Sequence, residues 1–206
     1  MANTQTLSIA RSVLSQEVGW TWPMFLAGSA IKGNAVFRKT HWAAPGVSKE
    51  EVRFPKRLSL AAGIYLGLKQ KFGQTRALAA MRRILVPIGE ATDRQFFDTL
   101  DLSNLTGIQR FVEFKQKMGE TPEHRYTQRK YVRVDDTTCH YIITRCLVYD
   151  FFLEAGTPEL TRSFCDTDQA FFPSAFPDLE FSRGASWENT MAYGKDHCEY
   201  LATKKA

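Results

Sequence analysis

The chain has 206 residues, of which 44% are hydrophobic and 24% are charged, the composition of an ordinary globular protein with one well-packed core. Its net charge of +5 is spread along the chain with no arginine-rich tract or zinc-finger spacing, so nucleic-acid binding is not expected. The most apolar stretch, residues 20–30, contains Pro23 and is too short to cross a bilayer. A buried helix is expected there rather than a membrane-surface helix.

Residues 1–10 lack a basic segment followed by an apolar run, so no secretory signal is expected and a cytoplasmic location follows. All four cysteines lie after residue 138. Their spacing matches no C-x-x-C zinc or redox motif, and in a cytoplasmic protein they are expected to be thiols.

The first 120 residues predict mainly helices. Residues 58–72 and 77–88 carry apolar side chains at the three-to-four-residue spacing of one helix face. Residues 41–55 contain two prolines and a glycine and predict a loop, and residues 106–117 predict a further helix. Pro87 and Gly89 favour a helix end near that point.

The hydrophobic period changes to two in the last third of the chain. Residues 126–135 and 139–146 alternate as half-buried strands do, and Asp135-Asp136 between them predicts the turn of a hairpin. Residues 179–183 and 198–202 alternate in the same way and predict two more strands.

Between these strands, two helices are expected. Val148, Phe151, Phe152 and Ala155 recur at helical spacing, and Gly156 follows as a helix stop. Thr157-Pro158 is typical of a helix start and predicts a second helix that runs towards residue 168. The predicted fold is therefore α+β: one domain of residues 1–206, in which a mainly helical layer (1–120) packs on an antiparallel sheet in a strand-rich region (121–206).

A series of polar residues and turns follows a fixed order in this strand-rich region: Arg145-Cys146, Gly156, Pro158-Glu159-Leu160, Cys165-x-x-Asp168, Arg183 and Gly194-x-x-x-Cys198-x-Tyr200. This order and spacing over residues 126–203 resembles the signature of the L-2-amino-thiazoline-4-carboxylic acid hydrolase family. The resemblance implies that a cyclic amidine is opened by water at the carbon between sulfur and nitrogen, which gives a carbamoyl derivative of L-cysteine.

Such a reaction needs a nucleophile or activated water, a proton donor, and a cation for the substrate carboxylate. Residues that carry the resemblance can fill these roles: the catalytic candidates are Cys165, Asp168 and Cys146, and the substrate-binding candidates are Arg183, Arg145 and Cys198. Phe172 is a further substrate-binding candidate, because the motif Phe171-Phe172-Pro173 just beyond Asp168 is the part of the aromatic region expected to face the pocket. A thiolate is favoured by a neighbouring cation, for which either arginine would serve. The sequence does not divide the roles between the two arginines.

Two alternatives remain open for these residues. Asp168 and Arg183 could form a purely structural ion pair. Zinc could be held by Cys146, Cys165, Asp168, Cys198 and His197, although His197 and Cys198 should point to opposite faces of their strand. No cofactor is expected on balance.

Other functions also remain open. The many aromatic residues of the last third favour, as a first alternative, a repurposed enzyme of specialised metabolism that acts by acid–base catalysis on a larger apolar or aromatic intermediate. A non-catalytic small-molecule-binding protein is the second alternative. The expected partner is a small-molecule substrate, with no nucleic acid and no membrane, and a homodimer is left open.

Overall fold

The computed structural model describes residues 4–121 and 124–205. It divides into two compact units. The helical unit comprises Met1–Gly89 and Phe151–Thr167, and the strand-rich unit comprises Glu90–Asp150 and Asp168–Ala206. That residues 1–206 form one domain stays a prediction.

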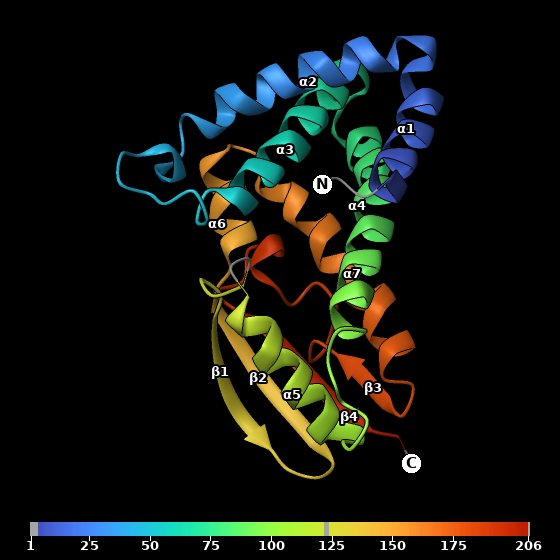
Figure 1. Cartoon of the computed structure of the whole chain (residues 1–206), viewed down its shortest axis with the longest axis vertical. Coiled ribbons are helices and arrows are strands. Elements are labelled where there is room, and N and C mark those ends of the chain that lie inside the picture. Colours follow the sequence, from blue (N-terminus) through green and yellow to red (C-terminus); the bar gives the residue numbers. More distant parts are fainter. Residues whose placement is uncertain (1–3, 122–123, 206) are drawn as a thin grey trace. The chain divides into compact units, whose positions relative to one another are not determined.

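The helical unit is built from helices of two separate parts of the chain (Figure 1). They are α1 (Thr4–Val18), α2 (Trp22–Phe37), α3 (Arg53–Phe72), the first part of α4 (Gln74–Phe97), the second half of α6 (Leu147–Glu154) and the start of α7 (Thr161–Ala175), with short 3₁₀ turns at Gly19–Thr21, His41–Ala43 and Pro158–Leu160. The helices expected around residues 58–72, after residue 147 and before residue 168 are confirmed. None of the described helices is both long and apolar enough to cross a membrane.

Helices α2 and α3 approach each other closely because glycines face one another between them. A Cβ atom built on Gly63 would lie 2.0 Å from the carbonyl oxygen of Ser29, and one on Gly33 would lie 2.4 Å from that of Ser59. Both values are far below ordinary contact distance, so only glycine fits at these positions. This contact fixes which face of α2 is covered by α3.

The helix end predicted at Pro87 and Gly89 is wrong, because α4 continues through both residues to Phe97. An internal proline costs a helix one backbone hydrogen bond. The burial of apolar side chains on either side of it, at Met81, Ile84 and Phe97, offsets this loss of stability. Gly89 marks a close contact instead of a helix end: a Cβ atom there would lie 2.6 Å from Oγ1 of Thr167 on α7.

The strand-rich unit contains a four-stranded sheet in the order β1-β2-β4-β3, with every neighbouring pair antiparallel (Figure 1). Its strands are β1 (Gln128–Val134), β2 (Thr138–Arg145), β3 (Leu179–Ser182) and β4 (Cys198–Lys204), and a 3₁₀ turn at Met191–Tyr193 precedes β4. Helix α5 (Gly107–Glu120) packs against β2 and β4. The predicted hairpin, the two later strands and the α+β class are all confirmed.

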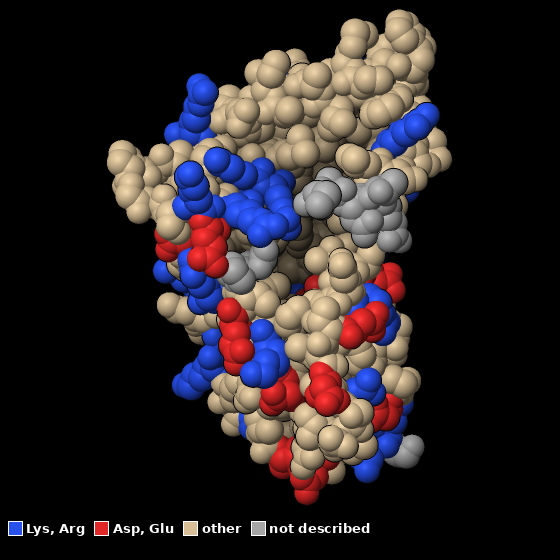
Figure 2. All heavy atoms as spheres, viewed as in Figure 1, with Lys and Arg blue, Asp and Glu red and all other residues tan. Residues whose placement is uncertain are grey.

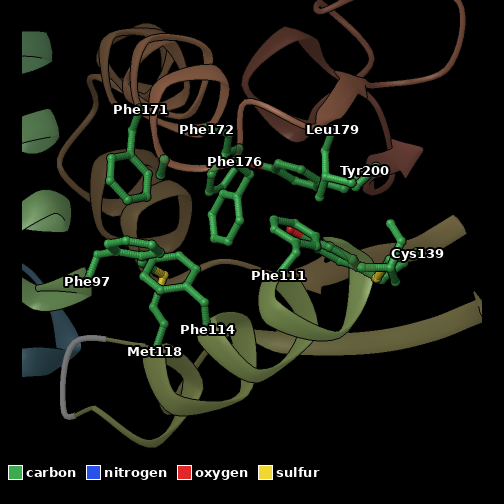
Figure 3. Close-up of a cluster of buried hydrophobic side chains, with 14 of the residues drawn as sticks. Phe97, Phe111, Phe114, Met118, Cys139, Phe171, Phe172, Phe176, Leu179 and Tyr200 are labelled. Atoms are coloured by element: carbon green, nitrogen blue, oxygen red, sulfur yellow. The ribbon is translucent and has the colours of Figure 1, made fainter. Parts of the chain in front are cut away.

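Aromatic rings fill the core of this unit (Figure 3). Phe111 of α5 meets Phe172 and Phe176 edge to face at centroid distances of 5.5 and 5.3 Å. Phe97 at the end of α4 meets Phe176 in the same way at 5.4 Å. These contacts hold the ends of α4 and α7 against α5, and each of the three helices carries one of the charged residues considered next.

Candidate functional site

A buried arginine organises the polar centre of the strand-rich unit. Arg183 follows β3, and none of its side chain is exposed. Its Nη2 atom donates to Oδ2 of Asp168 on α7 at 2.7 Å and to the hydroxyl of Tyr200 on β4 at 2.7 Å. The Tyr200 hydroxyl in turn donates to the same Oδ2 atom. The structure therefore joins Asp168, Arg183 and Tyr200, all three of which belong to the sequence signature.

Aromatic rings cover the guanidinium on two sides. The Cζ atom of Arg183 lies 4.5 Å from the ring centre of Tyr200 and 4.9 Å from that of Trp187. Asp168 keeps 22% of its side chain exposed, so the carboxylate is the accessible end of the group and the guanidinium is its buried end. Such a buried arginine fixes the position of the carboxylate in front of it.

A second buried cation, Lys115 of α5, was not predicted from the sequence. The residue is 5% exposed, and its ammonium lies 4.9 Å from the ring centre of Phe172 and 5.9 Å from those of Tyr141 and Tyr200. Within the described residues, the hydrogen-bond acceptor found for this ammonium is the sulfur of Met118, at 3.7 Å. Burial, followed by the positive charge of Arg129, lowers the pKa of Lys115 to about 8.

A second carboxylate, Asp93 of α4, completes the group. Burial, followed by the negative charge of Asp168, raises the pKa of Asp93 to about 7, while the charge of Lys115 acts in the opposite direction. We call Asp93, Lys115, Asp168, Arg183 and Tyr200 the charge cluster. It joins two carboxylates to two buried cations, and one of its carboxyl groups titrates near neutral pH.

Further polar residues surround the charge cluster. Arg129 of β1 donates from Nη1 to the carbonyl oxygen of Lys115 at 2.9 Å, and its Cζ atom lies 5.2 Å from the ring centre of Tyr141. Burial and the charges of Lys115 and Arg129 lower the pKa of His124 to about 3. His124 is therefore neutral at physiological pH, where it shares a hydrogen bond of 2.9 Å with the Thr121 hydroxyl.

Two of the predicted substrate-binding residues lie in the core of the strand-rich unit. Cys198 is 6% exposed, and its sulfur accepts a hydrogen bond from the backbone nitrogen of Met191 at 3.4 Å. Phe172 is 1% exposed and packs against the rings of Phe111 and Phe181. Phe172 contacts the charge cluster through the ammonium of Lys115.

Arg145 and Cys146 lie at the end of β2, where the chain turns into α6. Half of the Arg145 side chain is exposed, and its Nε atom pairs with Asp150 at 2.9 Å. Cys146 is half-buried against the core of the unit. The predicted catalytic role of Cys146 and the predicted binding role of Arg145 stay predictions.

Cys165 and Asp168 both lie on α7, as the sequence predicts, but α7 passes from one unit to the other between them. Cys165 is half-buried and belongs to the helical unit, whereas Asp168 belongs to the strand-rich unit. All four cysteines fall within the described residues and are thiols, as expected. Burial raises the pKa of the Cys139 thiol to about 11, which suits a core residue.

The zinc alternative finds no matching geometry in the described part of the chain. No three or more of its histidine, cysteine, aspartate and glutamate side chains come together in a group that could hold a metal ion. His197 is exposed and the neighbouring Cys198 is buried, in accord with their opposite strand faces.

Sequence reasoning missed Asp93 and Lys115, although a signal existed for both. Lys115 falls on the apolar stripe of α5, four residues after Phe111 and three before Met118, where a charge is unusual. Asp93 lies four residues before the buried Phe97. The sequence did not place Asp93 on a helix, because Pro87 and Gly89 predicted that the helix ends before residue 93.

A comparison with protein-family models adds to this geometry. The model described as L-2-amino-thiazoline-4-carboxylic acid hydrolase matches residues 56–201. The chain belongs to this family. The matched region includes all five residues of the charge cluster as well as Cys146, Cys165 and Cys198, and the family name denotes a hydrolase. Neither the curated proteins nor the solved structures contain a match to the chain.

Proposed function

We propose that the protein is a hydrolase that opens a small cyclic amidine of the L-2-amino-thiazoline-4-carboxylate type, and that the charge cluster carries the reaction. The observation behind this proposal is Asp168, partly exposed and hydrogen-bonded to the buried Arg183 and to Tyr200, with Asp93 and Lys115 close enough for their charges to act on it. Family membership supplies the class of reaction.

The substrate matches this arrangement of charges. A 2-amino-thiazoline presents the N–H groups of an amidine, which are hydrogen-bond donors and carry positive charge when protonated. The two hydrogen bonds that described residues make to the Asp168 side chain use Oδ2, and the side chain is partly exposed, so Oδ1 is the atom that accepts from the substrate. Arg183 and Tyr200 act as positioning residues for this carboxylate.

Asp93 is the proposed proton carrier. A carboxyl group with a pKa of about 7 is present in both protonation states at neutral pH, which suits general acid–base catalysis. Water adds to the carbon between sulfur and nitrogen, Asp93 takes a proton from that water, and the proton passes to the amidine nitrogen. In the second step, the ring carbon–sulfur bond breaks as the carbonyl forms: its electron pair leaves with the sulfur, and Asp93 takes the hydroxyl proton and delivers it to that sulfur, which becomes the cysteine thiol. One water is consumed, and the product is carbamoyl-cysteine.

The sequence also suggested a route through a thiol. We prefer the carboxylates because Asp168 is held by Arg183 and Tyr200 and keeps part of its side chain exposed, whereas Cys139 and Cys198 are buried core residues. When Asp93 and Asp168 are both ionised, their negative charges repel each other. The positive charge of Lys115 reduces this repulsion.

The test is turnover of L-2-amino-thiazoline-4-carboxylate, followed as carbamoyl-cysteine by mass spectrometry, with wild type, Asp93→Asn and the matched control Asp98→Asn. Asp98 is exposed and lies just beyond the end of α4. We expect turnover by wild type and Asp98→Asn, and a loss of at least about 100-fold for Asp93→Asn, the range that a general acid–base group contributes. Absence of turnover by wild type would reject the substrate, and full turnover by Asp93→Asn would reject the proposed role of Asp93.

A further inference from the structure

Helix α2 is apolar on both of its faces, but only one face is packed. The covered face lies against α3 through Ser29 and Gly33. The opposite face forms a continuous stripe at helical spacing that begins just before the helix, at Trp20, and continues through exposed residues: Pro23, Met24, Ala27, Ala30, Ile31, Asn34 and Ala35. A helix that is apolar all round is normally enclosed on all sides, so this uncovered face requires an explanation.

The exposure of this stripe is large. Trp20 is 84% exposed, Ile31 72% and Met24 65%, which makes them the three most exposed large hydrophobic residues among those described. Isolated exposed apolar residues are common on protein surfaces, but Met24 and Ile31 are seven residues apart on one side of α2, and Trp20 lies in the 3₁₀ turn that leads directly into this helix.

The charge around the stripe has a single sign. Between Glu17 and Glu50 the sequence contains no acidic residue, whereas Lys32, Arg38 and Lys39 are present and exposed. In Figure 2, the part of the surface formed by α2, at the top of the view, carries no acidic side chain. A partner that covers the stripe would therefore meet positive charge at its edge and at the C-terminal end of α2.

From these observations we propose that α2 docks on an anionic lipid surface, with Trp20, Met24 and Ile31 in the interface and Lys32, Arg38 and Lys39 against the headgroups. Tryptophan and basic residues are the side chains that favour the boundary between headgroups and acyl chains. The helix has 16 residues and lies on the surface without crossing it. This inference departs from the expectation of no membrane partner drawn from the sequence, because the sequence pattern predicted a helix buried on all sides.

The experiment is co-sedimentation of the full chain with vesicles of phosphatidylcholine alone and with vesicles that contain phosphatidylserine. We expect binding to the anionic vesicles that falls as salt is raised. We also expect Trp20→Ser/Ile31→Ser to lower this binding at least about tenfold, and Arg38→Glu/Lys39→Glu to do the same without removing any apolar residue. The matched control is Leu153→Ser, which replaces a side chain that is 53% exposed on α6.

Circular dichroism tests whether each variant is folded. Because the two double variants change different side chains, either of them alone can test the proposal if the other does not fold. Failure of the wild type to bind anionic vesicles would overturn the proposal. It would also be overturned if Leu153→Ser bound as weakly as the α2 variants, or if sedimentation showed a wild-type dimer that the α2 substitutions dissociate, because a second copy would then cover the stripe.

Discussion

At the scale of single residues, the charge cluster combines groups that are costly to bury. Lys115 is almost fully buried, and among the residues that the structure describes its ammonium has aromatic rings and a thioether as neighbours in place of a hydrogen-bonded carboxylate. Burial also raises the pKa of Asp93. Groups that destabilise a fold in this way are typical of functional sites, where activity is maintained at the expense of stability.

Lys115→Met is therefore expected to stabilise the protein while it reduces activity. At pH 7 the lysine is protonated, although burial disfavours its charge, so an apolar side chain of similar length should raise the free energy of unfolding by about 1–3 kcal/mol. Urea denaturation measures this change. Lys117→Met, on the exposed side of the same helix, should stay within about 0.5 kcal/mol of wild type. A clear loss of stability in Lys115→Met would mean that the lysine is a structural partner of the carboxylates.

The pH dependence of hydrolysis follows from the same two residues. Asp93 must be ionised to take a proton from water, so kcat/KM should fall as the pH drops below about 7. Lys115 must be charged, so kcat/KM should also fall above about pH 8. In Lys115→Arg the cation persists to much higher pH, and the alkaline decrease should disappear while the acidic one remains. A flat profile in wild type, or an unchanged alkaline limb in Lys115→Arg, would argue against these roles.

At the scale of secondary-structure elements, local periodicity predicted most helices and strands, but it did not predict where α4 ends. Pro87 and Gly89 favour a helix end by local rules, and the contacts that override them come from residues distant in sequence, such as Thr167 against Gly89. The uncovered face of α2 was missed for a related reason. An apolar pattern indicates that a face avoids water but does not say what covers it.

The contact between α2 and α3 gives a test at this scale. Gly63→Ala should lower the free energy of unfolding by about 3 kcal/mol, because its Cβ would lie 2.0 Å from a backbone oxygen that cannot rotate away. Gly28→Ala is the matched control, because a Cβ atom there meets nothing within 4 Å. Inside a helix, that change should stabilise by up to about 1 kcal/mol. Thermal or urea unfolding compares the two variants, and equal stabilities would contradict the close packing of these helices.

At the scale of the whole molecule, the order of the elements and the α+β class were predictable, because both follow from hydrophobic periods of 3.6 and 2 along the chain. The link between Asp168, Arg183 and Tyr200 was partly predictable, because all three belong to the family signature. Asp93 and Lys115 were not, because their positions depend on how α4 and α5 pack on the core. Burial and charge interactions are properties of the folded molecule that residue spacing does not record.

Stability against acid provides a test for the whole molecule. His124 has a folded pKa of about 3 against an ordinary value of 6.5, so the unfolded state binds more protons between these values and stability falls as the pH drops. Relative to wild type, His124→Gln should be more stable at pH 5 than at pH 7 by on the order of 2 kcal/mol, since glutamine does not titrate and can still bond to Thr121. Urea denaturation of both proteins at the two pH values measures this difference, and an identical response would show that His124 is accessible to protons in the fold.

The most direct test of the proposed site compares a carboxylate with a thiol. Hydrolysis of L-2-amino-thiazoline-4-carboxylate is measured for Asp168→Asn and for Cys165→Ser, with circular dichroism to verify that both are folded. The charge cluster predicts that Asp168→Asn loses at least about 100-fold in kcat/KM and that Cys165→Ser retains most of the wild-type rate. Loss of turnover in Cys165→Ser with an active Asp168→Asn would contradict the account and assign the chemistry to the cysteine.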